Sequence, residues 1–149
     1  MCIRDRNKSM NGEKMIKGGC LCGKIRYEFK QEDVISAGNC HCKDCQKATG
    51  SGKATIVYVP SESLKINDDY KIYSVIGYEG SNVNRGFCPN CGSPIISYVS
   101  EQPDVKFIKA GSLDDSSWLK IESNFWSDTA NHWDPVDRKL PTFEKNPPL

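Results

Sequence analysis

Seven of the eight cysteines in this 149-residue chain fall into three short clusters. In chain order the clusters are CLC at 20–22, CHCKDC at 40–45 and CPNC at 88–91. Thiolates two or three residues apart can bind one metal ion, because a tight turn brings both sulfur atoms to about 2.3 Å from a shared zinc ion. Four ligands close a structural zinc site. Seven ligands therefore predict one closed zinc site and one zinc site with three protein ligands and an open fourth position.

Two other roles of the cysteines are alternatives to metal binding: structural disulfides and a redox-active pair. An even number of cysteines is typical of a disulfide framework in a secreted protein. However, C-x-C and C-x-x-C pairs are poor structural disulfides, no signal segment is evident, and a chain of this length can build a core without cross-links. A redox-active pair would lie between a strand and a helix of a βαβ unit, and the sequence around Cys88 has no such pattern. The spacing therefore favours metal ligation.

Glycines beside the first and third clusters indicate which cysteines share an ion. Each of these clusters is a pair of thiols flanked by glycine, which allows backbone amides to turn toward the sulfur atoms. Two such pairs complete one structural site, with the ligands Cys20, Cys22, Cys88 and Cys91. The middle cluster is a single loop before a short predicted helix, so its thiols can cap one face of a second ion. The predicted catalytic residues, which also bind this second zinc, are Cys40, Cys42 and Cys45.

Composition indicates one soluble globular domain. Hydrophobic residues make up 38% of the chain, charged residues 26%, and the formal net charge is +1, so no charge excess attracts nucleic acid. A ββα zinc finger needs two histidines at helical spacing late in the motif, and the chain has only His41 and His132. The apolar stretch at 54–59 is too short to span a bilayer. We therefore expect a cytoplasmic protein, whose reducing surroundings suit metal-binding thiols, with no nucleic-acid or membrane partner.

Residues 1–17 are polar and basic and have no hydrophobic period, so we expect a leader outside the fold. The opening at 1–6 resembles read-through of a sequencing adapter. We hypothesise that the leader is not native and that Cys2 has no function, which intact-mass analysis of the natural protein would test. Residues 18–149 are expected to form a single zinc-binding catalytic domain.

Short strands separated by turn residues dominate the rest of the chain and predict a mainly β fold. Strands are expected at 24–29, 53–59, 71–76, 95–99 and 105–110. Turns are expected at 18–19, 67–69, 77, 80–82 and 111–112. Helical segments are expected only at 42–49, ended by Gly50, and for a turn or two around 114–119. The pattern predicts several short antiparallel sheets with few short helices.

The charge of the second site predicts its ligand. Three thiolates and one divalent ion sum to a formal charge of −1, which makes the ion a weak Lewis acid and a better match for a thiol than for water. A thiol that enters the open position would lose its proton. Four cations near the clusters in sequence are candidates for substrate carboxylates, although an exposed position is the commoner fate of such residues: Lys43, Lys47, Lys53 and Arg85.

Other residues have a chemical and a structural interpretation. His41 lies between two ligands, where an exposed position or a hydrogen bond to a ligand is favoured over ligation. His132 is a candidate acid or base, but a lone histidine in a loop is more often a surface residue. Trp126 and Trp133 could line a pocket or pack on the sheet. Asp44 could orient a bound group or interact with free amides at a helix start.

Five segments resemble the glutathione-dependent formaldehyde-activating enzyme family, also called the centromere-protein-V family. They are GGCLCGKIRY at 18–27, CHCKDCQKATGS at 40–51, RGFCPNCGSP at 85–94, AGSLDD at 110–115 and LPTF at 140–143. The resemblance covers about residues 18–143 and includes the order and spacing of all seven clustered cysteines. It implies an Mss4-like β fold with two zinc ions per chain, on the two ligand sets named above.

The resemblance also implies a carbon–sulfur lyase that joins formaldehyde to the thiol of glutathione, giving S-hydroxymethylglutathione. The small thiol would then be the partner of the site, and the oligomeric state is not indicated. Where the family carries a histidine before its late tryptophan-bearing segment, this chain has Asn124, which argues against proton transfer from that segment. A non-catalytic, zinc-stabilised binding module is the alternative, because Mss4-like folds also serve as interaction modules and fold alone does not determine function.

Overall fold

Ten strands in two sheets and one α-helix form the regular structure of residues 14–147, the part of the chain that the computed structural model describes. The strands are β1 (Met15–Gly19), β2 (Arg26–Lys30), β3 (Ser36–Cys40), β4 (Ala54–Pro60), β5 (Lys65–Ile66), β6 (Lys71–Ile76), β7 (Asn82–Phe87), β8 (Pro94–Val99), β9 (Val105–Lys109) and β10 (Ser123–Phe125). The helix is α1 (Lys43–Thr49), and short 3₁₀ turns lie at Gln31–Asp33, Ser61–Ser63, Ala110–Ser112 and Ser127–Thr129. The predicted mainly β class is confirmed.

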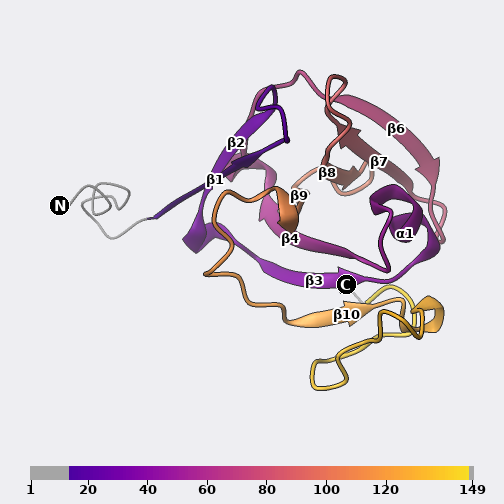
Figure 1. The fold of residues 1–149 in the computed structure, drawn as a ribbon. Coiled ribbons are helices and arrows are strands. Elements are labelled where there is room, and N and C mark those ends of the chain that lie inside the picture. The colour runs from indigo at the N-terminus through magenta and orange to yellow at the C-terminus, as the bar shows by residue number, and fades with distance from the viewer. Residues whose placement is uncertain (1–13, 148–149) are drawn as a thin grey trace.

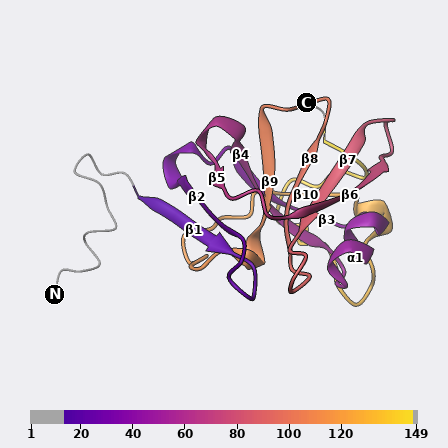
Figure 2. The same ribbon diagram turned by 90° about the horizontal axis from the view of Figure 1, so that it is seen from above.

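The two sheets divide the molecule into a small and a large part. The small sheet has the order β1-β2-β5, and the large sheet has the order β10-β3-β4-β9-β8-β7-β6. All neighbouring strands pair antiparallel, as expected, except β3 and β10, which pair parallel. The ribbon views place β1 and β2 at one end of the molecule and α1 near β3 at the other (Figure 1, Figure 2).

The main core contains side chains from both sheets, and β2 and β4 contribute alternating positions to it. Its largest members are almost completely buried: Ile25, Phe29, Val57, Ile95, Ile96 and Ile108. Each such side chain contributes about 1.5–3 kcal/mol through burial. The other face of β4 presents Ala54 and Ile56 to a second, smaller cluster that also contains Cys45. Strand β4 therefore separates the main core from one of the cysteine groups.

The fold begins earlier than expected. Residues 15–17 were expected to lie outside it, but they are the first three of the five residues of β1 and pair with β2. Gly18 and Gly19 were expected to form a turn and instead end this strand, because β1 passes very close to its neighbours. A Cβ on Gly18 would lie 2.3 Å from Tyr27 Oη and 2.5 Å from the carbonyl oxygen of Ser112. Residues 1–13, which include Cys2, lie outside the described residues.

The first predicted helix is confirmed and the second is not. Helix α1 ends at Gly50, whose φ of 72° is the left-handed conformation that glycine adopts most easily. At 114–119 the chain makes a single turn, in which the Leu119 amide donates to the carbonyl of Ser116 at 3.0 Å. Side chains fix this segment instead: Trp118 packs edge-on against Phe29. Within residues 14–147 we find no helix with the length and apolar character needed to cross a membrane.

Candidate metal centres

The first and third cysteine clusters meet at one point of the structure. Cys20 and Cys22 lie in the loop after β1, and Cys88 and Cys91 lie in the loop between β7 and β8. All four sulfur atoms lie within 4.8 Å of one another, with separations of 3.6 Å between Cys20 and Cys22 and 3.7 Å between Cys22 and Cys88. A tetrahedral zinc site with metal–sulfur distances of about 2.3 Å has sulfur–sulfur edges of about 3.8 Å. This donor set therefore fits a closed four-thiolate zinc site.

Local turns aim backbone amides at these sulfur atoms. Gly23 and Gly92 have φ angles of 84° and 79°, and their amides close turns onto the carbonyls of the first cysteine of each pair. The Ile25 amide then donates to Cys20 Sγ at 3.2 Å. The expected role of glycine is thus seen at these two positions, whereas Gly19 belongs to β1. Amide donors of this kind stabilise thiolates, which are the form that binds metal.

The middle cluster forms a second group at the start of α1. Cys40 ends β3, Cys42 is the N-cap of α1 and Cys45 lies in its first turn, and their sulfur atoms all lie within 4.8 Å of one another. Cys42 Sγ accepts the amide of Cys45 at 3.3 Å, which replaces the usual oxygen cap. Three thiols at these separations fit one face of a tetrahedral zinc ion.

Two cations lie beside the three-cysteine cluster. Arg85 Nη2 lies 4.0 Å from Cys45 Sγ. The pKa of Cys45 is lowered to about 2, first because the thiols of Cys40 and Cys42 donate hydrogen bonds to its sulfur, and further because Lys109 and Arg85 favour a negative charge there. Burial opposes this shift. The same hydrogen bonds raise the pKa of Cys40, which acts as a donor. The cluster therefore carries negative charge, and the sheet next to it supplies positive charge.

Strand register brings Lys109 to this face of the large sheet. Lys109 in β9 pairs with Ile56 of β4, which packs in the same cluster as Cys45. Paired residues of neighbouring strands point to the same face. Phe107, two residues before Lys109 on the same face of β9, pairs with Ser97 of β8, and Ser97 pairs with Arg85 of β7, so these side chains lie on the side of the cysteines. Lys109 Nζ donates to Ser97 Oγ at 2.8 Å. Burial lowers the pKa of Lys109 to about 8, and the negative charge of Cys45 opposes this.

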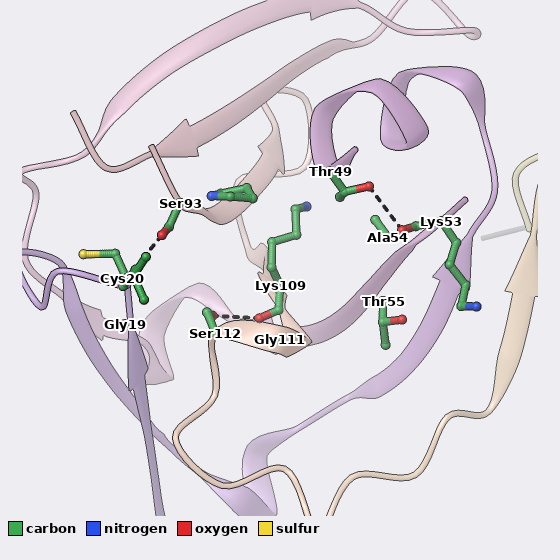
Figure 3. A pocket seen from close by; sticks show the side chains of 12 residues that line it. Gly19, Cys20, Thr49, Lys53, Ala54, Thr55, Ser93, Lys109, Gly111 and Ser112 are labelled. Carbon is green, nitrogen blue, oxygen red and sulfur yellow. Dashed lines mark hydrogen bonds between the residues drawn. The ribbon is translucent and has the colours of Figure 1, made fainter. Parts of the chain in front are cut away.

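A pocket of about 440 Å³ lies between the two cysteine groups. One wall is the loop at 19–21 beside the four-thiol site, and another is the segment at 53–55, where Ala54 pairs with Cys40. Figure 3 shows the Lys109 side chain in the middle of this pocket, between Ser93 and Thr49. Lys53 also lines it, but its Nζ forms an ion pair with Asp134 Oδ1 at 2.7 Å. The volume is within the range of small-molecule sites.

The four predicted cations have different positions. Lys43 and Lys47 are exposed on α1 and do not line the pocket, which agrees with their expected surface position. Lys53 and Arg85 are half-buried and lie at the pocket and at Cys45, respectively. Sequence reasoning missed Lys109. Its only signal was a lysine on the same strand face as the apolar residues Val105 and Phe107, and this does not reveal what the face contacts.

His41 is more buried than expected. Its side chain is 1% exposed, and neither ring nitrogen has a hydrogen-bond partner within residues 14–147. The carbonyl of Gly52 is near enough to favour protonation, but burial outweighs this and lowers the pKa of His41. His41 is therefore neither exposed nor a donor to a ligand. His132 is exposed, as expected for a surface histidine, and Trp133 is exposed as well.

Asn124 has a structural role. It is completely buried, and its side chain donates to the carbonyl of Asp137 at 2.9 Å and accepts from Asn39 at 3.3 Å. Its backbone bonds with the segment at 141–143. Trp126 lies half-buried, packed edge-on against Tyr78 and donating to Asn146. Neither residue lines the pocket. Because β10 pairs with β3 and also bonds with the segment at 141–143, it connects the end of the chain to β3.

Comparisons with known proteins agree with this arrangement. Residues 15–129 match the family described as glutathione-dependent formaldehyde-activating enzyme. A crystal structure of a Rhodobacter sphaeroides protein is similar, with a TM-score of 0.53 and 17% sequence identity over 85% of this chain and 98% of that one. At this identity the similarity shows the fold alone. No curated protein matches the sequence. The matched family range contains both cysteine groups and all residues of the pocket.

Proposed function

This chain belongs to the glutathione-dependent formaldehyde-activating enzyme family, and we propose that it is a zinc-dependent carbon–sulfur lyase that acts on adducts of small thiols. In the reaction that the family name indicates, the sulfur of glutathione bonds to the carbon of formaldehyde, and the thiol proton ends on the aldehyde oxygen. The product is S-hydroxymethylglutathione, and the reverse reaction breaks the carbon–sulfur bond.

One observation carries this proposal: the two cysteine groups differ in their number of ligands. Within residues 14–147, four thiols converge in the first group, but no histidine, aspartate, glutamate or further cysteine joins Cys40, Cys42 and Cys45. Structural zinc sites are closed by four protein ligands, whereas catalytic sites keep one position open. Ala54, which pairs with Cys40 and packs in the same cluster as Cys45, lines the pocket. A substrate in the pocket would therefore lie close to the three-cysteine group.

The surroundings of the three-cysteine group suit a thiol substrate. Cys40, Cys42 and Cys45 would hold the zinc ion, which when bound favours the thiolate form of a coordinating thiol. Ala54, Ile56 and the ring of Phe107 pack around the sulfur atoms and limit access of water. Arg85 and Lys109 offset the negative charge of the protein thiolates. All seven clustered cysteines are free thiols here, and a reducing compartment such as the cytoplasm would preserve them.

Exchange NMR of glutathione with formaldehyde tests the proposed reaction. With zinc-loaded protein at neutral pH, we expect the exchange rate between free glutathione and its hydroxymethyl adduct to exceed the rate in buffer. The buffer rate is the necessary control because thiols add to formaldehyde without an enzyme. Exchange no faster than in buffer would reject this reaction and favour a zinc-stabilised binding module.

A further inference from the structure

Lys109 is a buried cation without an acidic partner. Its side chain is 8% exposed, and within residues 14–147 its Nζ has no carboxylate at ion-pair distance, because the ion pairs there join Arg26 to Asp114, Lys53 to Asp134 and Lys145 to Asp128. Ser97 Oγ accepts one of its three possible hydrogen bonds. A buried ammonium group is costly unless other charges compensate it. The negative charge of the nearby cysteines offsets part of this cost, but the hydrogen bond to Ser97 is the one that the ammonium group donates within the described residues.

The pocket offers Lys109 no carboxylate partner. Its lining contains no aspartate or glutamate, and its one cysteine, Cys20, belongs to the four-thiol site. The charge of Lys53 is already balanced by Asp134. A carboxylate of a ligand could therefore pair with Lys109 without displacing a carboxylate of the protein.

The direction of the side chain points to the pocket. Lys109 is among the residues that line the pocket, and Figure 3 shows its ammonium group within the space between Ser93 and Thr49. We propose that Lys109 binds a carboxylate of the substrate in this pocket, and that the site therefore selects small thiols that carry a carboxylate. This inference rests on the proposed function and adds the substrate class and the residue that recognises it.

Binding of glutathione and of its diethyl ester tests the role of Lys109. The ester keeps the thiol but lacks both carboxylates. Hydrogen bonds to charged groups contribute about 1.5–3 kcal/mol, so calorimetry on zinc-loaded protein should show that glutathione binds about 10-fold to 100-fold more tightly than the ester. In Lys109→Met the two dissociation constants should approach each other, and Lys109→Arg should restore part of the difference. Methionine matches lysine in shape and removes a buried charge, so we expect this variant to fold.

Lys47→Met is the matched control, because Lys47 is exposed on α1 and does not line the pocket. It should keep the wild-type ratio of dissociation constants. A structural role for Lys109 would weaken both ligands equally and leave the ratio unchanged, and this result would overturn the inference. Equal binding of both ligands by the wild-type protein would also overturn it. A third result is possible, in which the ratio of dissociation constants depends on Lys109 but the protein does not accelerate exchange between glutathione and its adduct. It would support the carboxylate site and reject the proposed reaction.

Discussion

Serine in place of Cys91 is expected to unfold the domain. The four-thiol site joins the loop after β1 to the loop between β7 and β8, and so connects the small sheet to the large one. Structural zinc contributes about 10–16 kcal/mol of apparent binding energy in small zinc domains, whereas a domain of ordinary size is stable by only about 5–15 kcal/mol. Without a complete set of ligands, we expect the domain to lose most of this stabilisation and with it the packing of the two sheets. Circular dichroism during heating should show no cooperative transition in this variant.

Leu21→Ser is the control for this experiment. Leu21 lies between two ligands of the same loop, but its side chain is 89% exposed and contributes no sulfur. This variant should melt within a few degrees of the wild-type protein, because exposed substitutions usually change stability by less than about 0.5 kcal/mol. If Cys91→Ser melts as cooperatively as Leu21→Ser, the four-thiol site does not support the fold.

Serine in place of Cys42 is expected to abolish the activity but to leave the domain folded. It removes one of the three proposed ligands of the catalytic ion, so exchange between glutathione and its adduct should fall to the rate in buffer. The fold should survive, because Cys42 Sγ caps α1 by accepting the amide of Cys45, and a serine hydroxyl is one of the best N-caps. Exchange NMR and thermal melting of the same zinc-loaded sample measure both effects.

Cys42→Ala separates the cap from the ligand. Alanine lacks both the sulfur and a capping oxygen, so it should be as inactive as the serine variant but less stable by about 1 kcal/mol. Activity in Cys42→Ser would contradict the assignment of this thiol to the catalytic site. Unfolding of Cys42→Ser to the same extent as Cys91→Ser would show that the two cysteine groups do not have the separate roles proposed here.

The cysteine groups were predictable because their geometry is largely local. Ligands two or three residues apart are brought together by one turn, and the sequence shows the turn glycines at Gly23 and Gly92. Strands with strong β-branched or aromatic content were also predictable: β6 occupies the predicted range, and β9 differs by one residue. These features depend on nearby residues, which a sequence displays directly.

Other features depend on tertiary contacts and were missed. Strand β7 has the sequence NVNRGF, whose asparagines and glycine are poor strand formers, and it forms because β6 and β8 pair with both of its edges. Its Gly86 is required by close packing, since a Cβ there would lie 2.7 Å from Ile96 Cγ2. The position of Lys109 beside the cysteines follows from the register of β9 with β4. Register is set by the assembled sheet, so the sequence alone did not reveal this cation.

The central claim is that one chain holds two metal ions, one in a closed site and one in an open site. Metal analysis of carefully reduced protein tests this most directly, because the four-thiol and three-thiol groups should each retain zinc. We expect two zinc ions per chain. A value of one would remove the proposed catalytic centre and contradict the account, leaving the four-thiol group as a structural site in a binding module.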